Sequence, residues 1–280
     1  MDIDKIIKDV EQHEKEKPYL TPFFTKFPTS KILLGDFLKI SGTYKEKSEV
    51  VLGYHFDFAK GIVKSSFSSS TNMIVIGKSR NSVNNVLYNI LTQIVGESTP
   101  IDTKLTVIAE DYDNVLLTSE YVERCHDGKY LSEVLDSIEN IIESRIKFLN
   151  KEGYLNAESY IKAGNQLCKS YVVLDSLNDL LRTMDFNVVT GIREKLISLL
   201  KRGRRAGVYF IATYIDSDLR FVAEDTLVQR FSVKLVTVPS YNLIIDVDLI
   251  HDFCKKSVYL PITNSNTEKE LLLKYLKVKI

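Results

Sequence analysis

The chain has 280 residues, in which 37 Lys and Arg balance 37 Asp and Glu, so its formal net charge is zero. A hydrophobic fraction of 44% excludes a disordered chain, and the length allows one large α/β domain or two smaller ones. Because a neutral chain has no overall attraction for phosphates, a polyanion binder of the histone type is disfavoured, whereas a local basic stripe stays open.

The predicted elements alternate between helices and short apolar strands. An amphipathic helix is expected over residues 2–15, before Pro18, and one or two strands within residues 31–58. Further strands are expected at Met73–Ile76, Leu105–Ala109, Tyr171–Leu174, Val208–Thr213, Val233–Val238, Val258–Ile262 and Tyr275–Val278. Helices are expected over residues 81–95, 130–150 and 192–200. Uninterrupted apolar strands that alternate with helices predict an α/β fold with a mostly parallel sheet covered on both faces.

Metal sites, disulfides and membrane spans are not expected. The three cysteines, Cys125, Cys168 and Cys254, are far apart and form no CxxC pair, so they are interpreted as thiols in a reducing cytoplasm. No apolar run approaches the roughly 20 residues that span a bilayer. No histidine has a serine or cysteine arrangement that would indicate a hydrolase triad. We therefore expect a soluble intracellular chain, which could be a cytoplasmic piece of a larger membrane protein.

A degenerate phosphate-binding loop is predicted after the strand Met73–Ile76. The Gly-Lys-Ser sequence at Gly77 follows that strand directly, whereas a working loop places Gly-Lys-Ser/Thr at the start of the helix. Aligned from the strand, the loop is the following eight residues: Gly77, Lys78, Ser79, Arg80, Asn81, Ser82, Val83 and Asn84. Ser82 then replaces the second glycine and Val83 the phosphate-binding lysine.

These replacements disfavour nucleotide binding on physical grounds. Ser82 adds a Cβ where the backbone approaches phosphate, and Val83 removes the ammonium group that neutralises the β- and γ-phosphates. Asn84 could offer a carbonyl oxygen to magnesium in place of a hydroxyl, and Lys78 and Arg80 could attract phosphate. An inert turn is favoured over weak binding of ATP and Mg, and no resident cofactor or metal is expected.

A second nucleotide-related element is the strand that ends at Asp175. An Asp-Glu pair at such a strand end would hold the magnesium water and position the attacking water, but Ser176 takes the glutamate position. Serine cannot accept a proton at neutral pH, so little or no hydrolysis is expected and no catalytic residue is assigned. The simpler interpretation is that Asp175 ends a buried strand and caps the next helix.

These segments, in this order, resemble the FtsK/SpoIIIE family of hexameric ATPases. The resemblance runs through Asn72–Leu91, Ser144–Ala163, Lys169–Leu181 and Leu196–Thr213, and it covers most of residues 45–262. The block Leu199–Thr213 is the most specific part, and Tyr214 stands where the family has a polar sensor residue, usually Gln. The departures resemble the C-terminal ATPase module of EssC/EccC-type proteins, the motor of type VII secretion, whose distal modules are frequently degenerate.

The resemblance implies a RecA-like P-loop fold over residues 31–280, preceded by a helix and a Pro-containing lead-in over residues 1–30. It further implies a cytoplasmic module of a membrane-anchored protein, which would recruit secreted WXG100-type substrates and contact neighbouring ATPase modules in a hexameric motor. DNA is not the expected partner. The alternative is an active ATP-driven translocase acting on DNA or protein, for which Lys78 is the nearest candidate lysine.

Three other clusters admit two interpretations. Four cations within Lys201–Arg205 favour a helix C-terminus, with Gly203 helping the chain to turn, over an intersubunit arginine or a DNA contact. The aromatic residues of the segment 19–27 could pack the lead-in onto the domain or form an exposed docking patch. The acidic residues Asp111, Asp113, Glu120 and Glu123 are interpreted as a solvated loop and helix start.

Overall fold

The computed structural model describes residues 49–55, 62–67, 72–96, 98–109, 121–216, 222, 225–237, 244–249 and 255–259. The predicted N-terminal helix, the lead-in with its aromatic residues, and the predicted strand Tyr275–Val278 lie outside these residues. Asp111, Asp113 and Glu120 also lie outside them.

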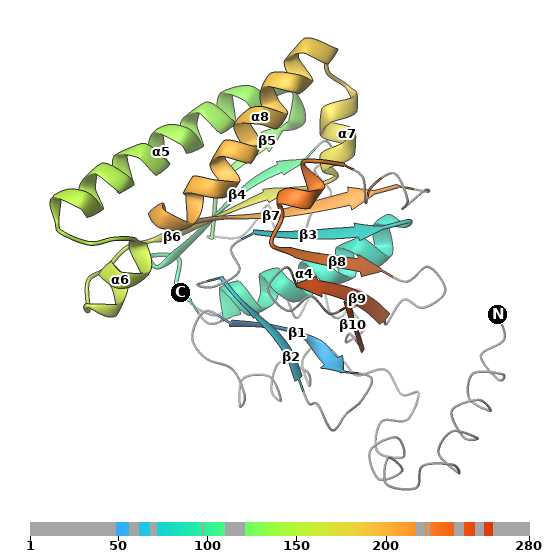
Figure 1. Cartoon of the computed structure of the whole chain (residues 1–280), viewed down its shortest axis with the longest axis horizontal. Coiled ribbons are helices and arrows are strands. Elements are labelled where there is room, and N and C mark those ends of the chain that lie inside the picture. Colours follow the sequence, from blue (N-terminus) through green and yellow to red (C-terminus); the bar gives the residue numbers. More distant parts are fainter. Residues whose placement is uncertain are drawn as a thin grey trace, which may run out of the picture.

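The described strands form one sheet in the order β2-β1-β10-β9-β8-β3-β7-β6-β4-β5 (Figure 1). Six neighbouring strands are parallel: β8 (Val233–Thr237), β3 (Asn72–Gly77), β7 (Val208–Ile215), β6 (Lys169–Leu174), β4 (Thr103–Ala109) and β5 (Val122–Asp127). Antiparallel strands extend the sheet beyond β8: β9 (Ile244–Leu249), β10 (Lys255–Tyr259), β1 (Glu49–His55) and β2 (Ile62–Ser66). Strand β3, which ends at Gly77, and strand β6, which ends just before Asp175, are therefore separated by β7 alone.

Helices cover both faces of the parallel part of the sheet (Figure 1). They are α4 (Arg80–Gly96), α5 (Leu131–Lys151), α6 (Ala157–Lys162), α7 (Leu177–Arg182) and α8 (Phe186–Arg202), with 3-10 turns η3 (Gly128–Tyr130), η4 (Gly203–Ala206) and η5 (Val228–Arg230). Because side chains alternate along a strand, Met73 and Val75 of β3 pack with α4, whereas Ile74 and Ile76 pack with α5, α7 and α8. The sheet thus separates two apolar cores.

The RecA-like α/β fold expected from the sequence is confirmed, and each predicted central element overlaps an observed one. Two expectations were wrong in detail. Strand β10 begins at Lys255, three residues before the predicted start. Glu123 lies in β5 rather than in a loop or helix start, because the edge position of β5 lets a polar sequence form a strand by pairing with β4 alone.

No helix of the described residues is long and apolar enough to cross a membrane.

Candidate functional site at the carboxyl ends of β3 and β6

The connection between β3 and α4 is very short. Strand β3 ends at Gly77 and helix α4 begins at Arg80, so that Lys78 and Ser79 alone link them. In a phosphate-binding loop, several residues separate the strand from the helix and wrap around the phosphates. Here the helix begins within the eight-residue window, and no such wrap is formed.

The N-terminus of α4 is capped by Ser79 of the same chain. Ser79 Oγ accepts a hydrogen bond from the backbone N–H of Ser82 at 3.3 Å and lies 2.8 Å from Ser82 Oγ. The carbonyl oxygen of Ser79 accepts from the N–H of Val83 at 3.2 Å. Ser79 therefore acts as an N-cap. Of the N–H groups that point out of the N-terminus of this helix, that of Ser82 is engaged by the Ser79 side chain.

Gly77 faces a filled space. A Cβ atom added at Gly77 would overlap Thr237 Oγ1, from the end of β8, and would lie 2.7 Å from Val83 Cγ2. Val83 is fully buried and belongs to the core between the sheet and α4. The glycine is thus required by close packing of the chain on itself, and Val83, which the sequence aligned with the phosphate-binding lysine, is a core residue.

Asp175 lies at the centre of a buried polar network. It follows β6, its side chain is only 5% exposed, and its Oδ1 accepts a hydrogen bond from Thr213 Oγ1 at 2.8 Å. Thr213 Oγ1 also accepts from the backbone N–H of Ser176 at 2.6 Å. Thr213 is fully buried on the neighbouring strand β7. The network therefore ties the ends of β6 and β7 together.

Arg80 reaches this network from the first turn of α4. Its Nη1 lies 3.9 Å from Asp175 Oδ2, and its Nη2 donates to Ser176 Oγ at 3.1 Å. Burial raises the pKa of the nearby Tyr88 hydroxyl, and the negative charge of Asp175 raises it further. The positive charge of Arg80 lowers it. The guanidinium group thus supplies a positive charge beside the one carboxylate that the sequence had associated with magnesium.

Ser176 has an unusual backbone. Its φ of 53° and ψ of 57° place it in the left-handed region, where it is alone among the described non-glycine residues. Ser176, rather than Asp175, occupies the N-cap position of α7, so the expectation that Asp175 caps this helix was wrong. The Asp175 carboxylate instead accepts a hydrogen bond from Thr213, which lies on the neighbouring strand β7. Strained positions of this kind cluster at functional sites and switch regions.

The eight residues of the predicted loop end in different environments. Lys78, Ser79, Arg80 and Asn81 are exposed, Ser82 and Asn84 are half-buried, and Gly77 and Val83 are buried. The Oδ1 atom of Asn84 is buried and has no hydrogen-bond partner among the described residues. Among the described contacts of these eight residues, Arg80 is the one that reaches Asp175 and Ser176.

The sequence did not reveal the part played by Thr213. Tyr214 had been placed at the sensor position, but its side chain packs with the core on the α5 and α8 face. Burial, together with Asp225 and Asp216, raises its pKa. Because neighbouring side chains in a strand point to opposite faces, Thr213 lies on the face of Asp175. The register of β6 against β7, which would have identified it, is not visible in the sequence.

The cluster Lys201–Arg205 lies at the opposite end of the sheet, before the start of β7. Arg202 donates to Glu139 and Glu143 of α5, both at 3.0 Å, which agrees with a helix C-terminus held by ion pairs. Gly203 has ordinary helical dihedrals, and a Cβ there would lie 2.6 Å from Val208 O. Gly207, with φ of 70°, makes the turn that had been assigned to Gly203.

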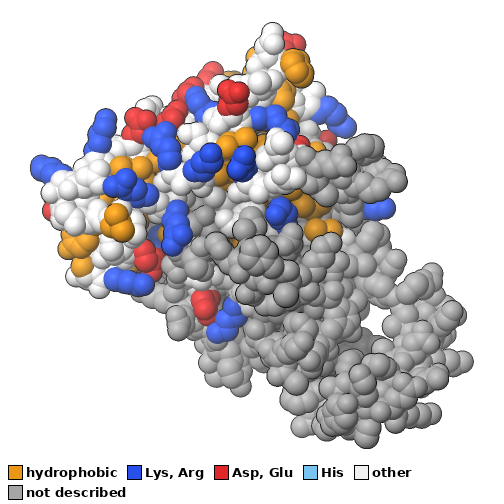
Figure 2. Space-filling model, viewed as in Figure 1, with side chains coloured by type: hydrophobic (Ala, Val, Ile, Leu, Met, Phe, Trp, Pro, Cys, Tyr) orange, Lys and Arg blue, Asp and Glu red, His pale blue; other side chains and the backbone are white. Residues whose placement is uncertain are grey.

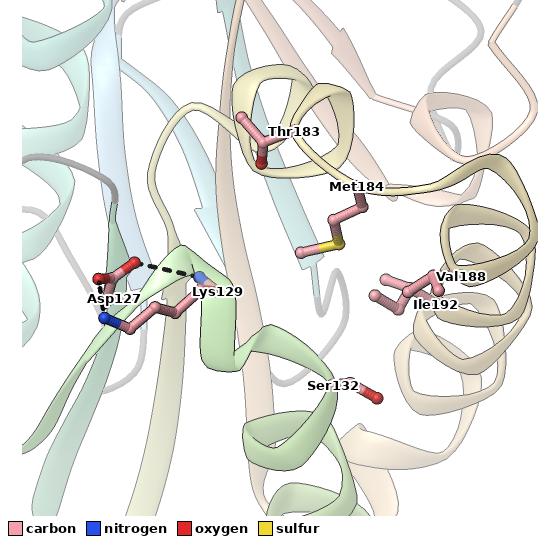
Figure 3. Close-up of a pocket in the computed structure, with 7 residues that line it drawn as sticks. All are labelled: Asp127, Lys129, Ser132, Thr183, Met184, Val188 and Ile192. Atoms are coloured by element: carbon pink, nitrogen blue, oxygen red, sulfur yellow. Dashed lines mark hydrogen bonds and ion pairs between the residues drawn. The ribbon is translucent and has the colours of Figure 1, made fainter.

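A separate cavity of about 540 Å³ opens beyond the carboxyl end of β5 (Figure 3). Met184, Val188 and Ile192 point into it from the start of α8 and the segment before it. The Lys129–Asp127 ion pair, 3.1 Å long, lies across the cavity from them. Ser132 and Thr183 complete the lining. The cavity is thus a mixed site with one apolar wall and one charged wall.

Similarity to known proteins is found at the level of structure. No protein-family model and no curated protein matches the sequence. The chain superposes on EssC (ATPases 2 and 3) from Geobacillus thermodenitrificans with a TM-score of 0.68 and 12% identity, over 84% of this chain and 49% of that one. The chain has the fold of these ATPase modules. It spans less than two thirds of the length of that EssC chain.

Two further structures share this fold. The pCW3 conjugation coupling protein TcpA, a monomer form with ATPγS, gives a TM-score of 0.65 at 14% identity over 84% of this chain and 72% of that one. EccC (ATPases 2 and 3) from Thermomonospora curvata, in complex with a signal sequence peptide, gives 0.60 at 16% identity over 79% of this chain and 42% of that one. The resemblance to EssC and EccC drawn from the sequence is therefore confirmed for the fold.

Large apolar side chains are exposed near the cavity. Phe186, in the first turn of α8, is 84% exposed, and Val188 and Tyr130 are 47% and 45% exposed. Side chains of this size are costly to leave in water unless something covers them. This end of the EssC-like fold therefore presents an apolar wall next to a lysine and an aspartate.

Proposed function

We propose that the chain is a catalytically degenerate ATPase module of a type VII secretion motor, which binds proteins and hydrolyses little or no ATP. The observation that carries the proposal is the contact of Arg80 with Asp175 and Ser176. The proposal is supported by the shared fold of the EssC and EccC structures. In it, residues 31–280 form the module, and residues 1–30 form the lead-in that connects it to a preceding part of a membrane-anchored protein.

Three features of the site oppose the binding of ATP with magnesium. The two-residue connection leaves no loop to surround phosphates, and the packing of Gly77 against Val83 and Thr237 fills the space beside it. Arg80 places a fixed cation beside Asp175, where a magnesium ion would meet electrostatic repulsion. The residues present therefore do not fit this cofactor, and binding is expected to be weak or absent.

Recruitment of a secretion substrate is proposed to use the cavity beyond β5 (Figure 3). One structural neighbour is in complex with a signal sequence peptide, and an apolar wall beside an ion pair suits an amphipathic peptide. Burial of Val188 and the exposed Phe186 by such a peptide would remove their apolar surface from water. Secreted WXG100-type proteins and neighbouring ATPase modules of a hexameric motor are the proposed partners.

Isothermal titration calorimetry with ATP and Mg²⁺ tests the catalytic part of the proposal. The expected result is no binding with a Kd below the order of 100 μM and no phosphate release above background. Binding in the low micromolar range with turnover would contradict it and would favour an active translocase. In that case Lys78→Ala should abolish turnover, whereas in the degenerate module it should change nothing.

Fluorescence anisotropy with a labelled export-signal peptide tests the recruitment part. Val188→Asp should weaken binding at least tenfold, because a charge on the apolar wall opposes burial. Ile101→Asp is a matched control, since Ile101 is 69% exposed and does not line the cavity. Equal loss of binding in both variants, or in neither, would contradict the assignment of the cavity.

A further inference from the structure

A second surface lies where α5 meets α6, at the end of the molecule remote from the candidate site (Figure 1). Leu155 is 73% exposed and Phe148 is 40% exposed there. Five exposed cations belong to the end of α5, to α6 and to η4, which contact one another at this end: Lys147, Lys151, Lys162, Arg204 and Arg205. We call these seven residues the α5–α6 tip. Figure 2 shows Lys and Arg side chains with apolar side chains between them at this end.

The tip is held in place by specific contacts. The ring of Phe148 packs edge-on against Tyr160, with centroids 5.6 Å apart, and Tyr160 packs in the same way against Tyr154 at 5.0 Å. Arg205 donates to the carbonyl oxygen of Leu155 at 3.1 Å and to Asn150 Oδ1 at 2.6 Å. The Asn156–Ser159 capping box begins α6 immediately after Leu155. The exposed leucine is therefore presented on an ordered turn.

The charge of this end is far from neutral. Residues 145–169 and 201–207 contain nine Lys and Arg against two Glu, in a chain whose total charge is zero. Arg202 is paired with Glu139 and Glu143, and Lys162 lies 3.7 Å from Glu158. Most of the remaining positive charge is exposed, so it produces a local field that the neutral total conceals.

We propose that the α5–α6 tip docks onto an anionic membrane surface. A few protruding apolar side chains ringed by Lys and Arg can enter the headgroup region while the cations interact with anionic lipids. Two exposed apolar side chains cannot by themselves supply the roughly 800 Å² per partner of a stable protein interface. A nucleic acid would use the cations but would leave Leu155 in contact with water. A membrane is thus the partner that would contact both the apolar and the cationic side chains of the tip.

Vesicle co-sedimentation of the whole chain tests this proposal. Vesicles with about one third phosphatidylglycerol are compared with pure phosphatidylcholine vesicles at low and high salt. Each lysine near an anionic surface contributes about 1 kcal/mol, which is about fivefold in the partition coefficient. Lys147→Glu and Lys151→Glu together should therefore reduce binding by more than about 25-fold, and Leu155→Ser should reduce it severalfold without changing the salt dependence. Phe186→Ser, at the other end of the molecule, is the matched apolar control.

The outcomes separate the occupants. Binding that needs anionic lipid and is weakened by the tip variants but not by Phe186→Ser supports the proposal. Equal binding to both vesicle types overturns it, as does the absence of binding, which would leave an acidic protein surface as the partner. Tighter binding to duplex DNA than to vesicles, lost with the lysines but unaffected by Leu155→Ser, also overturns it. Circular dichroism of each variant checks that the fold is retained.

Discussion

Replacement of Arg80 by Ala tests whether the guanidinium group is an energetic part of the Asp175 site. The substitution leaves the Asp175 carboxylate, which is 5% exposed, with Thr213 Oγ1 as its hydrogen-bond donor among the described contacts. It also removes the bond from Arg80 Nη2 to Ser176 Oγ. Because a buried carboxylate is costly without a compensating charge, the variant should be less stable than the parent chain.

The expected cost follows from the distance and the burial. Two unit charges 3.9 Å apart attract by about 4 kcal/mol at an effective dielectric constant of 20. Arg80 is 44% exposed, so solvent screening and desolvation offset most of this attraction, and a net loss of about 1–2 kcal/mol remains. Asp175→Asn should cost about 1 kcal/mol, because an amide oxygen can still accept from Thr213. The loss of stability in the double variant should be smaller than the sum of the two single losses by about 0.5–1.5 kcal/mol.

Urea denaturation followed by circular dichroism measures these free energies of unfolding. Arg182→Ala is the matched control, since its Nη2 lies 3.1 Å from Asp179 Oδ1 but the side chain is 78% exposed. That surface pair should contribute no more than about 0.5 kcal/mol. The reasoning is refuted if Arg80→Ala costs no more than Arg182→Ala, or if the effects of Arg80→Ala and Asp175→Asn are additive.

Three further predictions concern packing, pH and the basic cluster. Gly77→Ala should destabilise by more than about 2 kcal/mol in the same assay, because its Cβ would meet Thr237 and Val83; a smaller loss would show that the space can open. Burial raises the pKa of Tyr171 and Tyr209, so the folded state keeps protons that the unfolded chain loses near pH 10, and stability should fall as pH rises above about 10. Phenylalanine at both positions should flatten that dependence in urea titrations at successive pH values. Arg202→Ala should cost about 1 kcal/mol through its two glutamates, whereas Arg204→Ala should cost almost nothing; equal effects would contradict the structural assignment of Arg202.

The central elements could be predicted because their patterns are unambiguous. The run Met73–Ile76 is wholly buried in β3, and the three- and four-residue spacing of Leu131, Val134, Leu135 and Ile138 gives the buried face of α5. Strand β5 was missed because its sequence, VERCHD, has no apolar run. It is an edge strand, and its pairing with β4 rather than its own side chains decides its conformation.

The candidate site was predicted only in part, because sequence order does not give side-chain direction. The replacements at Val83 and Ser176 can be read directly from the spacing of the motifs, and the structure places Val83 in the core. The contact between Arg80 and Asp175 joins residues 95 positions apart and depends on where α4 begins. Thr213 depends likewise on the β6–β7 register, in which Leu174 pairs with Ala212.

Under the proposed function, Asp175 has a charge partner that does not depend on a bound nucleotide. A buried carboxylate between the ends of two parallel strands cannot simply lose its counter-ion, since the unpaired charge would destabilise the fold there. In an active ATPase, magnesium and phosphates join the loop after the first strand to the strand that carries the aspartate. Here Arg80 makes that connection from within the chain. The carboxyl ends of β3 and β6 are therefore linked without a ligand, which agrees with the protein-binding module proposed above.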